Sequence, residues 1–319
     1  MTPDEIIRLR QDLPSAEPFN YYTDRESAWL LQALLPADAP VRAVRQGPLA
    51  KLLDRPLVKP LTAAGDGMIR RADLQVLTHA DGPIPYESLT PATLAALERA
   101  FDLPWLDFEL SFTVWGNSNW HWAQTSRPGR NLVLQLNFPG DHAALLERTV
   151  GLQDRGKFEC PEHPVRRTGR PTLAWARLDI DRGAGVALIE EIQSDWLRFV
   201  RWELDDLRHL RPRSRALRDT QAYEAALTAR YEKVWPRAVL LAALKLLRDR
   251  LRIAEIYYHQ PGPGAVLKHS RPPVSLYSSL PKAFCFEPTR DVPPFLRRKR
   301  RKHLSRLPKD RPLFWKMAF

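Results

Sequence analysis

The pattern of apolar and polar residues divides the chain near residue 104. Before this point, apolar residues recur at helical spacing in short segments interrupted by prolines. We predict helices over residues 4–13, 28–35 and 91–101, the second after a capping box at residues 23–26. Residues 1–103 are therefore expected to form a mainly helical N-terminal lobe.

Strands are predicted from residue 105 onward. Residues 106–115 and 131–138 alternate between apolar and polar positions, as strands do. Two adjoining strands follow over residues 173–181 and 186–195, joined by Arg182-Gly183-Ala184-Gly185, a sequence typical of a hairpin turn. A central hairpin is therefore expected.

Long helices and a further strand follow this hairpin. Residues 196–251 have a helical pattern in which Pro236 is expected to begin the last helix, and residues 253–259 are β-branched and aromatic. This order predicts an α/β (α+β) core over residues 104–287, with one mixed sheet packed by long helices.

The C-terminal region is expected to contribute less to the core. A short helix is predicted over residues 275–283 and a last strand over residues 284–286. Residues 287–312 are rich in proline and basic residues and are expected to be irregular, so residues 288–319 are assigned to a basic tail whose aromatic end, residues 313–319, docks back on the core.

The segment with the most chemical potential is Glu190-Glu191-Ile192-Gln193-Ser194-Asp195-Trp196, directly after an apolar strand. Carboxylates are costly to bury, so their concentration at the end of a strand indicates a site. Strand alternation places Glu191, Gln193 and Asp195 on one face and Glu190 on the other.

The register of the hairpin decides which of these residues meets Asp179 on the preceding strand. A loop of even length sets Asp179 beside the face of Glu190, whereas a bulge sets it beside Glu191 and Gln193. The sequence leaves both registers open, and both gather carboxylates on one patch.

Paired carboxylates have a common use as ligands of Mg²⁺, which prefers oxygen ligands. Asp179, a hairpin and then Glu191-Ile192-Gln193 resemble the metal site of the PD-(D/E)xK nuclease superfamily over roughly residues 173–210, with Gln193 in place of the usual Lys. The resemblance implies a Mg²⁺ cofactor held by Asp179 and Glu191, and the hydrolysis of phosphodiester bonds. Gln193 would orient water, and Glu190 or Asp195 would assist.

A second resemblance covers about residues 105–285. His121-Trp122, then Arg177-Leu178-Asp179, then Glu190 to Trp196 occur in the order found in uncharacterised proteins of bacteria, phages and mobile elements that share an HW pair, an R-x-D strand and an EE[IV]QSDW element. This likeness implies a shared site and supplies no reaction.

Charge adds a candidate partner. The formal net charge is +12, and residues 297–311 contain nine Lys or Arg and one Asp. The run Arg297, Arg298, Lys299, Arg300, Arg301 and Lys302 predicts salt-dependent contacts with the phosphates of nucleic acid. A solubilising tail is the simpler alternative.

Aromatic residues and histidines supply further candidates. His121 lies between Trp120 and Trp122 in a polar loop, where the rings could stack on bases and the imidazole could transfer protons. His259 ends a predicted strand and is a second candidate for proton transfer. A half-buried aromatic loop and an ordinary core histidine are the structural alternatives.

Two short motifs predict little chemistry. Cys160-Pro161-Glu162-His163 resembles half of a zinc site but has no second cysteine pair. Residues 261–264 with Lys268 have the residue types of a phosphate loop without its spacing, so a simple turn is expected there.

The location expected from the sequence is the cytoplasm. Two cysteines far apart imply no disulfide framework, no signal peptide is recognised at the N-terminus, and the longest apolar stretch, residues 238–247, is too short to span a membrane. The oligomeric state is left open.

Three functions remain open from the sequence. The first is a Mg²⁺-dependent enzyme acting on nucleic acid, and the second is an acyl or ADP-ribosyl transferase. The third is a non-enzymatic protein that binds nucleic acid or another partner. In this case Arg177 or Arg201 would pair with Glu190 or Glu191, and Asp195 would cap the following helix. The first depends on the carboxylates facing an open cleft.

Overall fold

The computed structural model describes residues 1–63, 66–78, 90–103, 105–116, 124–151, 156–268, 273–299, 304–305, 307 and 310–319. Two compact units are present. The sheet unit comprises Met1–Phe19, Asp107–Leu280 and Pro288–Lys316, and the helical unit comprises Asn20–Leu106, Pro281–Glu287 and Met317–Phe319. The division differs from the expected one, because residues 1–19 and 288–316 both belong to the sheet unit.

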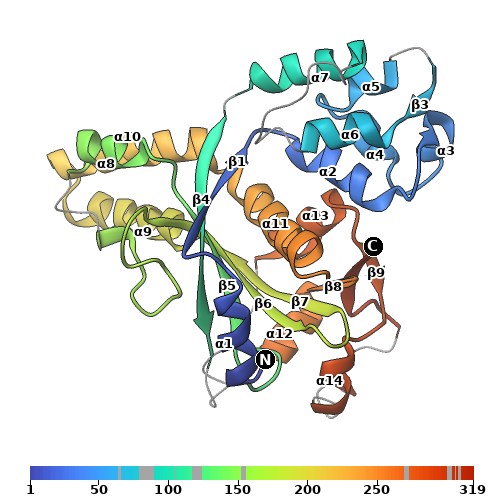
Figure 1. Ribbon diagram of the computed structural model, residues 1–319. Coiled ribbons are helices and arrows are strands. Elements are labelled where there is room, and N and C mark those ends of the chain that lie inside the picture. Colours follow the sequence, from blue (N-terminus) through green and yellow to red (C-terminus); the bar gives the residue numbers. More distant parts are fainter. Residues whose placement is uncertain are drawn as a thin grey trace. The chain divides into compact units, whose positions relative to one another are not determined.

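A mixed sheet of eight strands forms within the described residues (Figure 1), and this confirms the predicted fold class. Strands β4 to β7 are antiparallel, whereas β7 and β8 are parallel. The strand order across the sheet is β1 (Ala16–Tyr21), β4 (Leu106–Trp115), β5 (Asn131–Asn137), β6 (Thr172–Asp181), β7 (Val186–Gln193), β8 (Glu255–His259), β10 (Phe314–Ala318) and β9 (Glu287–Thr289).

The predicted hairpin is formed by β6 and β7 near the middle of this sheet. Asp181 pairs with Val186, so the loop has four residues, and Gly185 adopts a φ of 66° that favours glycine. The register then shifts, because Leu178 pairs with Ile189 but Arg177 pairs with Glu191.

Glu190 is therefore the extra residue of a β-bulge, and its insertion changes the side-chain phase of β7. Up to the bulge, successive side chains of β7 point to opposite faces, so Glu190 lies on the same face as Leu188 and its partner Asp179. After it, Glu191 lies opposite Arg177 on that same face. The two registers left open by the sequence thus both occur, one on each side of the bulge.

Helices cover the central strands. Every residue of β5 is buried, as expected for a strand covered on both faces. Helix α11 (Trp235–Lys245), which continues into a π-helical turn at Leu246–Arg250, packs against β5, β6 and β7. The helix begins at Trp235, one residue before the predicted start at Pro236, so the proline lies in its first turn.

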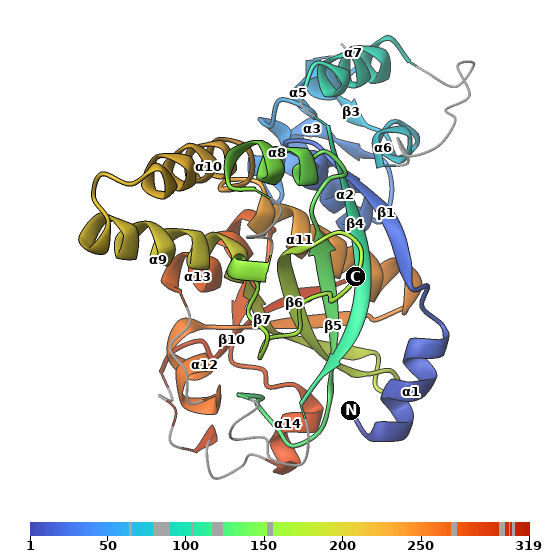
Figure 2. The ribbon, with the colours of Figure 1, turned by 90° about the vertical axis from the view of Figure 1, so that its left-hand side faces the viewer.

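A pair of helices extends from the end of β7. Helix α9 (Asp195–Leu210) begins directly after the strand, and α10 (Arg215–Tyr231) returns beside it (Figure 2). Helix α8 (His142–Thr149) packs on α10. Among the described residues, no helix has the length and apolar character needed to cross a membrane.

Residues near the C-terminus complete the sheet. Residues 287–312 were expected to be irregular, but they contain β9 and helix α14 (Pro294–Lys299). The expectation is wrong because Phe295 and Leu296, within the basic stretch, pack in one apolar cluster with Leu188 and Phe314. The predicted docking of residues 313–319 is confirmed, since β10 lies between β8 and β9.

Two smaller expectations also change. Residues 284–286 form no strand; β9 begins just after them at Glu287, and the last strand of the chain is β10. Residues 261–264 begin helix α12 (Pro261–Lys268) instead of a simple turn. Helix α1 (Pro3–Gln11) has a capping box at Thr2, and helix α13 (Val274–Ala283) confirms its prediction.

The helical unit contains short helices around an apolar core. The expected capping box before α2 is absent: Asp24 precedes the helix in a left-handed conformation and makes no side-chain cap, while Glu26 accepts from Tyr21. The elements are α2 (Arg25–Leu34), β2 (Ala39–Pro40), α3 (Val41–Arg45), α4 (Ala50–Leu53), α5 (Lys59–Ala63), β3 (Met68–Ile69), α6 (Arg71–Thr78) and α7 (Pro91–Phe101).

Candidate functional site

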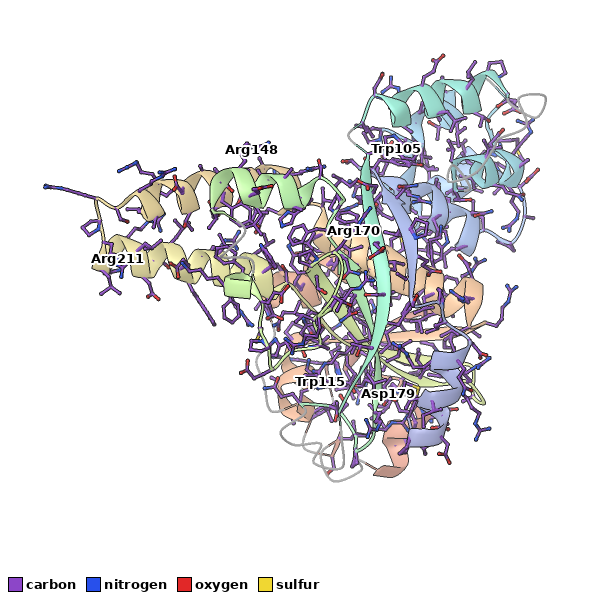
Figure 3. All side chains as sticks on the ribbon, turned by 60° about the vertical axis from the view of Figure 1, so that its left-hand side comes forward. Trp105, Trp115, Arg148, Arg170, Asp179 and Arg211 are labelled. Carbon is purple, nitrogen blue, oxygen red and sulfur yellow. The ribbon has the colours of Figure 1, made fainter. Side chains whose placement is uncertain are left out.

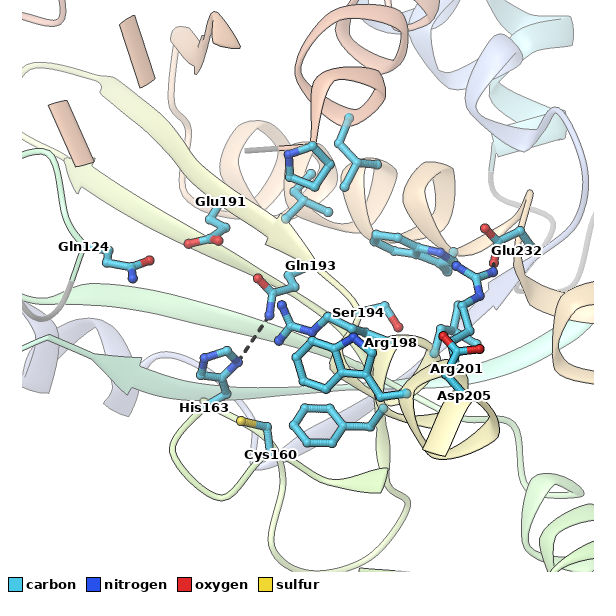
Figure 4. Close-up of a pocket in the computed structure, with 17 residues that line it drawn as sticks. Gln124, Cys160, His163, Glu191, Gln193, Ser194, Arg198, Arg201, Asp205 and Glu232 are labelled. Carbon is cyan, nitrogen blue, oxygen red and sulfur yellow. Dashed lines mark hydrogen bonds and ion pairs between the residues drawn. The ribbon is translucent and has the colours of Figure 1, made fainter. Parts of the chain in front are cut away.

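A cleft of about 840 Å³ opens in the sheet unit where β7 ends and α9 begins (Figure 4). Its size is within the usual range for ligand sites. Polar and aromatic side chains both contribute to the wall. The lining residues are Gln124, Cys160, His163, Glu191, Ile192, Gln193, Ser194, Leu197, Arg198, Phe199, Arg201, Trp202, Asp205, Glu232, Trp235, Pro273 and Leu276.

Glu191 is the carboxylate of the predicted segment that reaches this cleft. Its side chain is 15% exposed, and Oε2 accepts a hydrogen bond from Arg177 and lies 3.5 Å from Lys268 Nζ. Burial alone would raise the pKa of Glu191, but Lys268 and Arg177 hold that pKa below its ordinary value. Glu191 is therefore an ionised acceptor at the wall of the cleft.

Asp195 orients a histidine in the same cleft. His163 Nδ1 donates to Asp195 Oδ2 at 2.8 Å, and Trp175 Nε1 donates to the same oxygen at 2.8 Å. Arg198 contacts the other oxygen. Burial would raise the pKa of Asp195, but the hydrogen bonds from His163 and Trp175 lower it overall. The pair has the form of a carboxylate that fixes an imidazole for proton transfer.

Gln193 lines the cleft between Glu191 and His163 (Figure 4). Its Nε2 donates to Asp195 Oδ1 and lies 3.2 Å from His163 Nδ1. Gln193 thus positions the Asp195–His163 pair.

Cys160 also lines the cleft. Burial raises the pKa of its thiol, which disfavours the thiolate form needed for a nucleophile.

Glu190 occupies a closed cluster next to the cleft. Its side chain is fully buried, and it accepts from Ser126 N at 3.0 Å and from Ser126 Oγ at 2.8 Å. His259 Nε2 lies 3.1 Å from Glu190 Oε2 and 2.9 Å from Ser126 Oγ. We call Ser126, Glu190 and His259 the inner cluster.

The two titratable groups of the inner cluster have opposite charge preferences. Burial would raise the pKa of Glu190, but the hydrogen bond from His259 and the nearby Lys268 bring it down to about 2. Burial lowers the pKa of His259, so its imidazole is neutral at pH 7. Within the described residues, His259 Nδ1 is buried and makes no hydrogen bond.

Lys268 links the inner cluster to the cleft. Its side chain is 1% exposed, and Nζ donates to the backbone oxygen of Glu190 at 2.8 Å while facing Glu191. Tyr277 donates to that backbone oxygen at 3.2 Å. Burial lowers the pKa of Lys268 and raises that of Tyr277. The bulged backbone is thus held by two buried side chains.

Asp179 is occupied by other partners. It lies on β6 (Figure 3) and is fully buried. It accepts from Arg127 Nε at 2.5 Å and Nη2 at 2.8 Å, and from the amino group of Met1 at 3.1 Å. Cations of the chain therefore neutralise both members of the predicted Mg²⁺ pair, Asp179 and Glu191. The described residues hold no group of three or more His, Cys, Asp or Glu side chains suited to a metal ion. The donor set of that pair does not fit Mg²⁺.

The remaining predicted residues belong to the aromatic loop and to the basic stretch. His121, Trp120 and Trp122 lie outside the described residues. Arg297 is exposed on α14, where its Nε donates to the backbone oxygen of Val292. Arg298 and Lys299 belong to the same helix, and Arg300, Arg301 and Lys302 lie outside the described residues.

Sequence reasoning missed the residues that surround the carboxylates. His163 was visible only as part of an incomplete zinc motif, and Lys268 only as part of an unfit phosphate loop. Ser126 carried no signal at all. Arg177 was recognised as a possible partner of Glu190 or Glu191, and it pairs with Glu191.

No family model, no curated protein and no solved structure matches the chain. The function therefore has to be inferred from the residues of the cleft and the inner cluster.

Proposed function

We propose that the chain is an enzyme that cleaves phosphodiester bonds in RNA, with Glu191 as general base and His163 as general acid. One observation carries this proposal: an ionised carboxylate and an imidazole held by a buried carboxylate line the same cleft. Acid–base catalysis needs two such groups on one substrate.

The surrounding charges favour a phosphate substrate. Arg177 and Lys268 lie against Glu191, and Arg198 lines the cleft. Positive charge fixed beside a reacting phosphate stabilises the negative charge that develops on its oxygens. The net charge of +12 favours a polyanionic partner in general.

RNA suits this pair because it carries its own nucleophile. Glu191 accepts the proton of a ribose 2′-hydroxyl, and the 2′-oxygen forms a bond to the adjacent phosphorus. The bond from phosphorus to the 5′-oxygen of the next nucleotide breaks, and that oxygen takes a proton from the His163 imidazolium. The products are a 2′,3′-cyclic phosphate and a free 5′-hydroxyl, and no oxidant or co-substrate is consumed.

Two observations in one assay test this chemistry. Full-length protein is incubated with end-labelled single-stranded RNA and with DNA of the same sequence, each with Mg²⁺ and with EDTA. We expect RNA cleavage that persists in EDTA and leaves 2′,3′-cyclic phosphate ends. Cleavage of DNA that requires Mg²⁺ would instead support the nuclease type implied by the sequence resemblance.

Two variants test the assigned roles. Glu191→Gln and His163→Gln should each lower the cleavage rate by about 10²–10⁴-fold. Matched controls are Glu98→Gln on α7 and His209→Gln on α9, two exposed residues that do not line the cleft, and both should cleave normally. Equal rates for the cleft variants and their controls would refute the proposal. Stabilisation of the wild-type chain by NAD or acetyl-CoA, without RNA cleavage, would favour a transferase.

A further inference from the structure

An aromatic platform forms one wall of the cleft. Phe199 and Trp202 lie on α9 with ring centroids 5.1 Å apart, and the Arg198 guanidinium lies 5.1 Å from the centre of the Trp202 ring. All three side chains line the cleft. We call Arg198, Phe199 and Trp202 the α9 platform.

Trp202 is unusual in its exposure. It is 53% exposed, and among the tryptophans that the structure describes it is the only exposed one. Large aromatic rings are normally covered, because their burial is strongly favourable. An indole left open beside a cleft, with a guanidinium on it, is suited to stack on a second flat ring.

The charges in the cleft are arranged by position. At one end of the cleft Glu191 is paired with the two cations Arg177 and Lys268. At the far end Arg201 is paired with Glu232, beside Asp205 (Figure 4). The first end therefore has one cation in excess and attracts a phosphate, whereas the second end has one anion in excess and repels it. A nucleotide whose phosphate sits near Glu191 is therefore expected to direct its base toward the α9 platform.

We infer that the cleft takes single-stranded RNA, with one base stacked on Trp202. This inference rests on the proposed function for its RNA chemistry. A base inside a duplex has both faces covered by its neighbours, so only an unpaired base can lie on a side chain. Stacking is tolerant of sequence because every base has a flat face.

Binding without cleavage tests this inference. Fluorescein-labelled 2′-O-methyl RNA lacks the free 2′-hydroxyl, so its anisotropy reports binding to the wild-type chain. We expect Trp202→Ala to weaken binding of the single strand by about tenfold, and Trp202→Phe to weaken it less. The control is Leu210→Ala, an exposed apolar residue on the same helix that does not line the cleft, and it should bind as wild type.

The position of the base is tested with abasic oligonucleotides. Removing the base that contacts Trp202 should weaken binding to the wild-type chain and should have no further effect on Trp202→Ala. Equal affinity of Trp202→Ala and wild type for the single strand overturns the inference. So does a loss that is the same for the single strand and for the duplex.

The two proposals fail in different ways. If Trp202→Ala weakens single-strand binding while Glu191→Gln and His163→Gln cleave normally, the stacking site stands and the catalytic assignment is wrong. If those two variants lose cleavage while Trp202→Ala binds normally, the catalytic assignment stands and the stacking site is wrong.

Discussion

Glu190 and Glu191 are neighbours in sequence and point to the same face of the sheet, yet their surroundings differ. Glu190 is fully buried in the inner cluster, where donors from Ser126 and His259 converge on it. Glu191 is 15% exposed at the cleft and is paired with Arg177 and Lys268. The difference teaches that neighbouring carboxylates can have opposite settings, one enclosed in the interior and one at the wall of a cleft.

Glu190→Gln should have the largest effect on stability. An amide offers one acceptor oxygen where the carboxylate accepts several donors, and those donors are buried. We expect the free energy of unfolding to fall by about 3 kcal/mol, against about 1 kcal/mol for Glu191→Gln, which water can reach. Urea denaturation monitored by tryptophan fluorescence measures both free energies of unfolding. Equal losses in the two variants would contradict the distinction between Glu190 and Glu191.

The pH dependence of stability should follow the inner cluster. The pKa of Glu190 is lowered from 4.5 to about 2, so its contribution of about 3 kcal/mol is present above pH 4.5 and is lost as the pH falls toward 2. The pKa of His259 is lowered from 6.5 in the folded chain. Below that pH the unfolded chain binds a proton at His259 more readily than the folded chain does, so the free energy of unfolding falls there as well.

Urea midpoints measured from pH 7 down to pH 3 check this expectation. The decline below pH 4.5 should be much smaller in Glu190→Gln than in wild type. An unchanged midpoint in wild type between pH 7 and pH 3 would contradict the low pKa of Glu190.

Asp195→Asn tests whether Asp195 positions His163 in the cleft or only stabilises the fold. An amide that donates to His163 Nδ1 reverses the tautomer that the carboxylate holds. We expect RNA cleavage to slow by about 100-fold, with a changed pH–rate profile and little change in KM. Asp195→Glu should restore part of the rate, and a profile identical to wild type would show that Asp195 does not position the imidazole.

Tyr277→Phe should have the smallest effect. It removes one hydroxyl that donates to the Glu190 backbone oxygen, while Lys268 keeps its own hydrogen bond to that oxygen. We expect a loss of about 1 kcal/mol in the free energy of unfolding and normal RNA cleavage at low temperature. A cleavage defect without loss of stability would assign Tyr277 to the cleft instead.

Much of the sheet could be predicted from the sequence. Strands β4 and β5 were recognised from alternating residues, and β6 and β7 from two adjoining strand segments on either side of residues 182–185, where glycines allow the hairpin to turn. The carboxylate segment was found because charged residues directly after an apolar strand conflict with burial. Local patterns of this kind fix both the elements and the place of the site.

The partners of the carboxylates could not be predicted in the same way. Lys268 is 78 residues from Glu190, and Ser126 is 64 residues from it. A pairing of buried charges leaves no trace in the local pattern, because each partner looks ordinary in its own segment. The prediction of an irregular basic C-terminal region was wrong for a related reason. Its charge was evident, but the two apolar residues that anchor α14, Phe295 and Leu296, were not given weight.

The bulge at Glu190 also has a consequence for how such a site can be gained or lost. If Glu190 were deleted, Ile189 and Glu191 would still lie opposite Leu178 and Arg177, and every other pair of the hairpin would keep its partner. The ladder thus contains one residue more than regular pairing needs. A single in-frame codon deletion or insertion could therefore remove or restore the interior acid without changing the alignment of the rest of the hairpin.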